Sequence, residues 1–211
     1  MDFQRRLVVF LLVTKAAVAL NFIFPGEGTS GTRSVKAWLS CHGVRTMHWY
    51  QDEAKHIIHN MTVAQFASAD FHHLFRNFDA AMDTPLMAIW PYLFDAFPNA
   101  SIVLISRPAA EWRRSRMKGH PNSPRPFSWA FRENLHHVSQ YPWTMKHSQP
   151  IDEILYSANY ALIRERSKGR KFIEISMSDL CKRMLDLESF LDLVPRKQCH
   201  IESCGVAQPL R

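Results

Sequence analysis

The sequence predicts one α/β domain with three layers, in which a central parallel sheet lies between two layers of helices. Short apolar segments alternate along the chain with stretches of helical periodicity, and this alternation is typical of the βαβ units that build parallel sheets. The chain has 211 residues, of which 46% are hydrophobic and 12% aromatic. This length and composition suit one domain with a sizeable core rather than two domains, so we expect a single functional site.

The first half of the chain is expected to supply three strands and two helices. An apolar strand at 19–24 leads into a glycine-rich loop, and a helix at 34–41 follows the loop. A weaker strand candidate lies at 44–50. Apolar residues at helical spacing predict a helix over 62–77, and a short strand at 78–82 ends at the sequence Asp-Thr-Pro.

The second half begins with a helix at 86–97, which ends at a Pro-Asn turn before 100–106, the clearest strand of the sequence. Pro108 suits the first turn of the next helix, at 109–118, because the missing N–H of proline is not needed there. The last three elements are expected to be a helix, a strand and a helix, at 151–167, 171–176 and 184–193.

The segment 119–150 is expected to be a long loop or lid on the acceptor side of the site. It holds five of the 12 prolines together with many aromatic and histidine residues. Cations beside aromatic rings could hold a sugar or an acidic acceptor through stacking and ion pairing. A solvated loop with a few buried anchors explains the same composition, so both interpretations stay open.

The N-terminal segment has features of a signal that directs a protein into the secretory pathway. Two arginines precede an apolar run, and Ala17-Val18-Ala19 has the small-x-small pattern of a signal cleavage site. We expect 1–19 to be a signal peptide or signal anchor and 20–211 to be the domain; an extended first strand is the alternative. Sequons at Asn60 and Asn99 fit the secretory route. The expected location is the secretory pathway, in the Golgi lumen with membrane association through the N-terminus, and the alternative is the cytoplasm.

Charge and cysteines narrow the class of partner. A formal net charge of +7 and a pI near 9.4 favour an anionic partner such as a nucleotide, an acidic glycan, nucleic acid or an acidic membrane. The four cysteines form no CxxC pair, so the sequence does not indicate zinc. Cys199 and Cys204 could close a small C-terminal loop, and a set of free thiols is the alternative.

The loop after the first strand has the composition of a phosphate-binding turn. Glycines at 26, 28 and 31 let the backbone approach a ligand, and N–H groups at a helix start attract anions. The nucleotide-hydrolase pattern GxxxxGK[ST] is only half met, because Thr32 takes the place of the lysine. This difference argues against an ATPase or GTPase. A plain strand-to-helix turn is the alternative. Hydroxyl donors in the loop are Thr29, Ser30, Thr32 and Ser34.

A second anion-binding pair is expected where the 100–106 strand meets the following helix. Arg107 ends the strand, and Ser115 follows eight residues later, about two helical turns on. A guanidinium and a hydroxyl at the carboxyl edge of a parallel sheet suit a second phosphate, because open α/β sheets bind ligands at that edge. An ordinary basic helix is the alternative, since more arginines follow in the same helix.

These two motifs, in this order, resemble the sulfotransferases that use 3′-phosphoadenosine 5′-phosphosulfate (PAPS). The similarity covers 20–193, including the run FDAAMDTPLMAIWPYLFDAFPNASIVLISRPAAEW and the late segment KFIEISMSDLCKRM. It implies a P-loop nucleotide-hydrolase-like fold and transfer of a sulfuryl group to a hydroxyl or amine of a glycan or small molecule. It implies that Arg107 and Ser115 hold the 3′-phosphate. The residues implied for the 5′-phosphosulfate are Gly28, Thr29, Ser30, Gly31, Thr32, Arg33 and Ser34.

The sequence departs from the family at Thr29, where the loop normally has lysine or arginine. That cation offsets charge on the bridging oxygen as the sulfuryl group leaves. Arg33 or Lys36, one turn into the helix, is expected to substitute. If neither reaches, the chain is a nucleotide- or polyanion-binding relative without efficient transfer. A nucleotide-dependent kinase is a further alternative, disfavoured by the missing lysine.

Transfer to a hydroxyl also needs a base that takes the proton of the acceptor. Asp83 is our first candidate because it follows a strand and shares the sheet edge with both phosphate motifs. A cap of the helix from Leu86 is the alternative role. His48 is a further candidate, and His72 and His73 are weaker ones. No metal and no nucleic acid polymer is expected.

Overall fold

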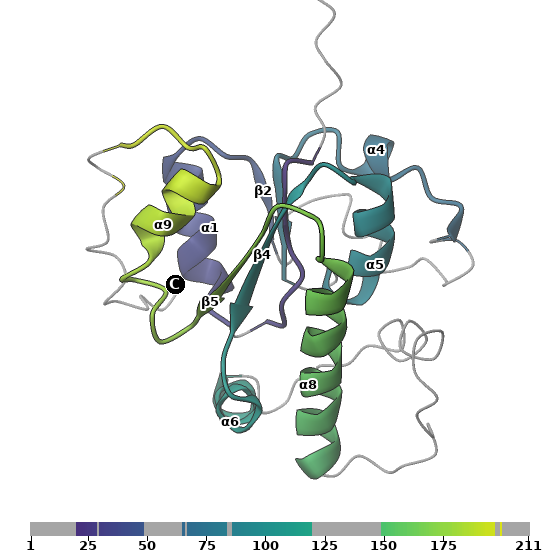
Figure 1. Ribbon diagram of the computed structural model, residues 1–211, viewed down its shortest axis with the longest axis vertical. Helices are drawn as coiled ribbons and strands as arrows, with labels where there is room; N and C mark the ends of the chain where they lie inside the picture. Colours follow the sequence, from purple (N-terminus) through teal and green to yellow (C-terminus); the bar gives the residue numbers. More distant parts are fainter. Residues whose placement is uncertain are drawn as a thin grey trace, which may run out of the picture.

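The computed structural model describes residues 20–28, 30–48, 65, 67–83, 86–119, 149–196 and 199. A parallel sheet of five strands in the order β2-β3-β1-β4-β5 forms its centre, with helices on both faces (Figure 1). The predicted three-layer α/β fold is confirmed. The strands are β1 (Phe22–Phe24), β2 (Thr46–Met47), β3 (Ala80–Met82), β4 (Ser101–Ser106) and β5 (Phe172–Ser176). The helices are α1 (Thr32–Cys41), α4 (Phe71–Leu74), α5 (Leu86–Ala96), α6 (Ala109–Gly119), α8 (Gln149–Arg166) and α9 (Met184–Phe190).

The sheet buries both of its faces, and β4 shows why its sequence is almost continuously apolar. Successive side chains of a strand point to opposite faces. Ile102 and Leu104 join the core with α5 and α8, whereas Val103 and Ile105 join the core with α1 and α9. In Figure 1, α1 and α9 accordingly lie on one side of the sheet, and α4, α5 and α8 lie on the other.

The strand order brings three sequence-distant segments to one edge. Strand β1 lies between β3 and β4, and it pairs with both of them in parallel. The carboxyl ends of these strands lead into the glycine loop (25–31), Asp83 and Arg107, respectively. Strands β2 and β3, which follow β1 in the sequence, lie on one side of β1 in the sheet, and β4 and β5 lie on the other side. Ligands of open α/β sheets bind at such a switch point.

Several elements differ in length from those expected. The second strand is reduced to two residues, β2, and α9 ends at Phe190 rather than continuing to 193. The helix expected over 62–77 is not continuous, because the described residues around Asp70 leave the helix before α4 begins. The Asp70 side chain accepts a hydrogen bond from the His73 N–H (2.9 Å), which is the geometry of a new helix start.

The cysteine expectation was wrong. Cys199 is bonded to Cys41, across a sequence separation of 158 residues, and not to Cys204. Cys181 is also disulfide-bonded, so the alternative of free thiols is wrong as well. Sequence spacing alone does not reveal which cysteines meet, because the pairing joins the last residue of α1 to a segment beyond α9. This link ties the C-terminal segment to the helix that follows the glycine loop.

Several expectations fall on residues that the structure does not describe, among them the sequon at Asn60 and two longer segments. These segments are the signal segment 1–19 and the loop or lid at 119–150, of which only the ends are described, as the last residue of α6 and the first two of α8. Among the described helices, none combines the length and the apolar character needed to cross a membrane.

Candidate functional site

The glycine loop ends in a helix start that favours an anion. Gly31 has φ 77°, a left-handed conformation that glycine adopts without strain, and α1 begins at the next residue. No side chain caps this helix start, and its first turn holds no acidic residue. The first bond of the helix runs from the Val35 N–H to the Gly31 carbonyl (3.2 Å). The preceding N–H groups therefore lie outside the intrahelical pattern and can point to a phosphate group.

A buried trio joins the start of α1 to the ends of β2 and β3. The Thr32 hydroxyl donates to Oδ2 of Asp83 (3.0 Å). Nε2 of His48 lies 3.2 Å from the same carboxylate oxygen and 3.3 Å from the Thr32 hydroxyl oxygen. All three residues are buried. A carboxylate and an imidazole thus meet beside the phosphate-binding loop, which is the type of pair that can accept a proton from an acceptor.

The backbone of Asp83 is unusual. It has φ 67°, and left-handed conformations of non-glycine residues cost about 1 kcal/mol or more. Its carbonyl accepts the Leu86 N–H (2.8 Å) at the start of α5, which agrees with the alternative of a helix-start residue. The carboxylate itself contacts Thr32 and His48. Asp83 therefore begins α5 through its backbone and serves the glycine loop through its side chain.

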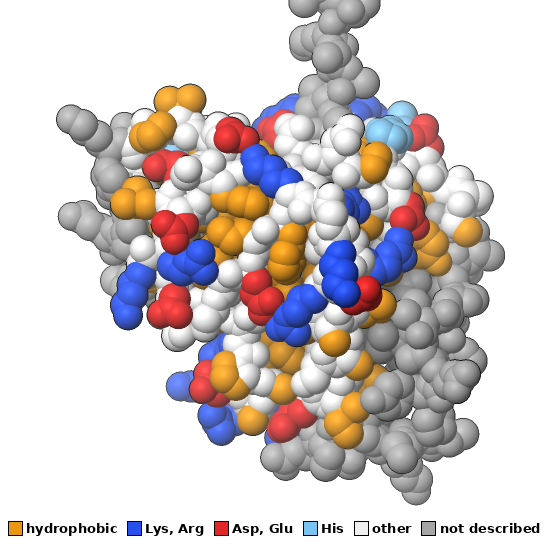
Figure 2. Space-filling view, viewed as in Figure 1, with side chains coloured by type: hydrophobic (Ala, Val, Ile, Leu, Met, Phe, Trp, Pro, Cys, Tyr) orange, Lys and Arg blue, Asp and Glu red, His pale blue; other side chains and the backbone are white. Residues whose placement is uncertain are grey.

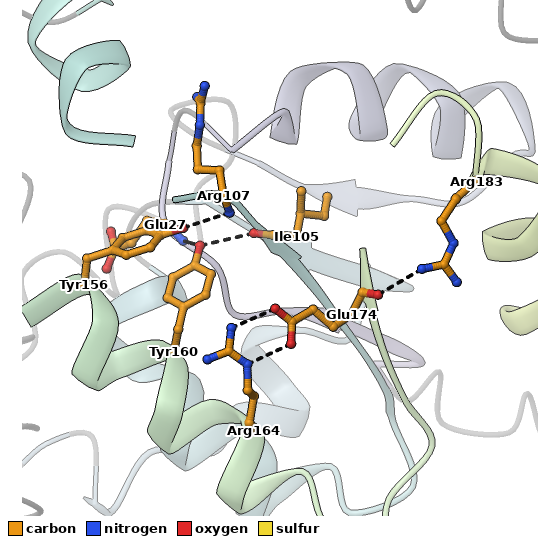
Figure 3. A network of polar contacts seen from close by, with 8 residues as sticks. All are labelled: Glu27, Ile105, Arg107, Tyr156, Tyr160, Arg164, Glu174 and Arg183. Carbon is orange, nitrogen blue, oxygen red and sulfur yellow. Dashed lines mark hydrogen bonds and ion pairs between the residues drawn. The ribbon is translucent and has the colours of Figure 1, made fainter. Parts of the chain in front are cut away.

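Two tyrosines of α8 brace the loop against β4 (Figure 3). The Tyr160 hydroxyl accepts the Glu27 N–H (3.0 Å) and donates to the Ile105 carbonyl (3.2 Å). The Tyr156 hydroxyl accepts the backbone N–H of Arg107 (3.3 Å). The two rings stack with centroids 4.1 Å apart, and burial raises the pKa of both hydroxyls. These contacts hold the glycine loop and Arg107 in a fixed relation to each other.

Glu27 lies inside the loop and is completely buried. Burial raises its pKa from 4.5 to about 8, against the opposing effect of Arg116 and with a smaller contribution from Asp83. Among the described residues, neither carboxyl oxygen of Glu27 has a hydrogen-bond partner. The side chain is therefore neutral near pH 7, because an ionised carboxylate without hydrogen bonds is unfavourable in the interior.

Helix α6 contacts the loop through two side chains one turn apart. Trp112 donates its indole N–H to the Gly28 carbonyl (3.0 Å). A Cβ atom at Gly28 would lie 2.8 Å from Oδ1 of Asp83 and 3.4 Å from Nη1 of Arg116. Glycine is required here because both side chains lie directly against the loop backbone. Two cations thus face the site from this part of the chain: Arg107, just before α6, and Arg116, within α6.

The structure brings together some of the expected residues and separates others. Thr32 and Asp83 are in contact, and Arg107 leaves the adjacent strand. Ser30 is buried, Ser115 is half-buried in α6, and Arg33 and Ser34 are exposed in the first turn of α1. Thr29 lies outside the described residues.

His72 and His73 do not belong to the site. Both are exposed on α4, and the His72 ring packs 4.7 Å from that of Phe97, which precedes β4. This position is at the amino-terminal edge of the sheet, opposite the glycine loop. Four further residues of the site were not predicted from the sequence: Glu27, Arg116, Tyr156 and Tyr160. The four-residue spacing of the tyrosines and the place of Arg116 after Ser115 were signals, but an ordinary apolar or basic helix face shows them too.

Comparison with known proteins gives a family. The profile described as a sulfotransferase domain matches residues 22–188, well over half of the chain. Among solved structures, the chain resembles a sulfotransferase from Alicyclobacillus acidocaldarius, with a TM-score of 0.52 and 18% sequence identity over 82% of this chain and 81% of that one. At this identity the likeness concerns the fold, and it agrees with the expected P-loop-like architecture. No curated protein sequence matches.

Proposed function

The chain belongs to the sulfotransferase family, and we propose that it moves a sulfuryl group from PAPS to a hydroxyl or amine of a glycan or small molecule. One observation carries the proposal. The helix start at Gly31, the Asp83–His48 pair and Arg107 follow three strands, β1, β3 and β4, that are neighbours in the sheet. An anion-binding helix start, a proton acceptor and a second anion-binding side chain thus share one edge.

The donor-binding roles follow from this arrangement. The N–H groups from Gly31 to Ser34 and the hydroxyl of Thr32 are proposed to bind the 5′-phosphosulfate. Arg107 and Ser115 are proposed to bind the 3′-phosphate, which separates PAPS from ATP. The tyrosine braces from α8 fix both segments, so the spacing between the two phosphates is set before the donor binds.

The proposed reaction is a direct displacement. The acceptor oxygen or nitrogen forms a bond to sulfur while the bond from sulfur to the bridging oxygen breaks. The bridging oxygen keeps the electron pair, and adenosine 3′,5′-bisphosphate leaves. The proton of the acceptor passes to Asp83, whose carboxylate is buried beside the glycine loop, with His48 next to it. A base in this position supports transfer to a group that is protonated at neutral pH.

The nature of the partners is also a proposal. On the face shown in Figure 2, Lys and Arg side chains are interspersed with Asp and Glu side chains, and no continuous basic patch is seen there. Among the described residues, cations and acids also form ion pairs, such as Arg164–Glu174 and Lys171–Asp192. On this face, such a mixture offers no extended basic surface for a nucleic acid polymer, and the proposed partner is therefore a small anionic donor. The disulfide between Cys41 and Cys199 supports a place in the oxidising secretory pathway, such as the Golgi lumen.

The first test is donor binding by titration calorimetry. We expect clear preference for adenosine 3′,5′-bisphosphate over ATP with magnesium, and a loss of about tenfold to a hundredfold in bisphosphate affinity for Arg107→Ala. Arg114→Ala, at an exposed position of α6, is the matched control. No preference in the parent, or equal behaviour of the two variants, would refute the donor site. Tight bisphosphate binding without transfer to any of a broad panel of acceptors would instead identify a binding relative of the family.

A further inference from the structure

The loop sequence lacks a cation at Thr29, yet a guanidinium from another element reaches the same loop. Arg116 of α6 lies four residues after Trp112, so both side chains project from one face of the helix. Trp112 bonds to the Gly28 carbonyl, and Nη1 of Arg116 lies 3.4 Å from the position of a Cβ atom on Gly28. Gly28 is the residue directly before Thr29.

Arg116 is a buried residue beside the loop, although its guanidinium nitrogens are not among the fully buried polar atoms without a partner. Arg116 is 8% exposed, and no hydrogen bond or ion pair connects its guanidinium to another described residue. Burial lowers its pKa, and the carboxyl groups of Glu27 and Asp83 raise it, so these two are the nearby acidic groups. A buried cation in this state is costly unless an anion completes its surroundings.

Among the described residues, no hydrogen bond or ion pair joins Arg116 to either nearby acid, although the Asp83 carboxylate favours its charged form. Glu27 is neutral near pH 7 because its pKa is raised to about 8. The Asp83 carboxylate already accepts the Thr32 hydroxyl and faces His48. Of the two cations that the sequence suggests as substitutes, Arg33 is exposed in the first turn of α1 and Lys36 is half-buried one turn into the helix. Nη1 of Arg116 lies directly against Gly28, so Arg116 is well placed to act on a group held by the glycine loop.

We infer that Arg116 supplies, from α6, the positive charge that the loop lacks at Thr29, and that it binds the 5′-phosphate end of the donor beside the bridging oxygen. This inference rests on the proposed function, because it assigns a residue to the same donor site. It also explains why a chain without the usual loop cation can still transfer a sulfuryl group. In the displacement, the guanidinium would offset charge on the bridging oxygen as its bond to sulfur breaks.

The test needs no acceptor, since it compares two donor fragments. Affinities for adenosine 3′,5′-bisphosphate and adenosine 3′-phosphate are measured by titration calorimetry in wild type, Arg116→Gln and Arg114→Gln. We expect Arg116→Gln to lose about tenfold or more in bisphosphate affinity and to keep its 3′-phosphate affinity within about twofold. Arg107→Ala should instead weaken both ligands. Adding Thr29→Arg to Arg116→Gln should restore bisphosphate affinity.

The outcomes separate the inference from the proposed function. If the wild type binds adenosine 3′,5′-bisphosphate no more tightly than ATP with magnesium, both the proposed function and the role of Arg116 are overturned. A wild type that prefers the bisphosphate, with Arg116→Gln matching Arg114→Gln, overturns only the role of Arg116. If Arg116→Gln does not fold, Thr29→Arg in the wild-type background decides. It should gain less than about threefold if Arg116 already provides the charge, and about tenfold or more if no cation is present.

Discussion

The buried acid in the glycine loop gives a direct thermodynamic prediction. Its pKa is raised from 4.5 to about 8 by burial. Between these values the folded protein holds one proton more at Glu27 than the unfolded chain does. Stability from this residue is therefore complete at low pH and is lost as pH rises, by about 1.4 kcal/mol per pH unit. From about pH 5.5 to about pH 7.5 the loss amounts to about 2.7 kcal/mol.

The variant Glu27→Gln isolates this contribution, because glutamine has nearly the same shape and does not titrate. The free energy of unfolding of the variant minus that of wild type should increase by about 2.7 kcal/mol over the same interval. Urea denaturation followed by tryptophan fluorescence at several pH values measures the difference, with disulfides intact. Glu165→Gln, at an exposed position of α8, is the matched control.

A stability difference between Glu27→Gln and wild type that stays constant with pH, or narrows as pH rises, would contradict a raised pKa of Glu27. Either result would mean that Glu27 is ionised in the folded protein and compensated by Arg116. The charge of Arg116 would then be consumed inside the protein rather than offered to a donor. The stability measurement therefore also tests a premise of the proposed donor site.

Two further predictions concern the base and the disulfide. Asp83→Asn keeps an oxygen that accepts the Thr32 hydroxyl, so its affinity for adenosine 3′,5′-bisphosphate should be equal to that of wild type or higher. The kcat for transfer to any identified acceptor should fall by about a hundredfold or more, because the base is lost. An unchanged kcat would exclude Asp83 as the base. Replacing both Cys41 and Cys199 by serine opens a loop of 158 residues and should lower the free energy of unfolding by about 5 kcal/mol in the chain-entropy model. Urea titration of the two forms would contradict this if their midpoints agreed.

The fold could be predicted because its main signals are local. The run from Ser101 to Ser106 is apolar on both faces, as a central parallel strand must be, and helical spacing or turn residues mark most neighbouring elements. Lengths were less predictable. The pattern over 62–77 continues through Asp70, and only the hydrogen bond of its side chain shows that a new helix starts there. The partner of Cys41 depends on how the C-terminal segment folds back, which no local pattern encodes.

Some residues of the candidate site could likewise be predicted from local sequence signals, whereas others depend on how the elements pack. The glycine loop and Arg107 are recognisable because each combines residue type with a strand end. The contact of Thr32 with Asp83 follows only once β1 and β3 are known to be neighbours. Arg116 lies among three arginines of one helix, and sequence cannot say which of them is buried. Burial against Gly28 makes that distinction, and it comes from the packing of α6 on the loop.

The placement of two acids beside an anion-binding loop needs a physical explanation, since each carboxylate would repel the donor. Complete burial keeps the Glu27 side chain neutral, so it occupies space without adding charge. The Asp83 carboxylate is hydrogen-bonded by Thr32 and lies next to His48 and Arg116. The Asp83 carboxylate and the Arg116 guanidinium then carry opposite charges, and the start of α1 adds the positive end of a helix dipole. If Glu27 ionised, it would make the total charge beside the loop negative, which is why the protonation of one buried side chain links the stability of this fold to its affinity for a donor.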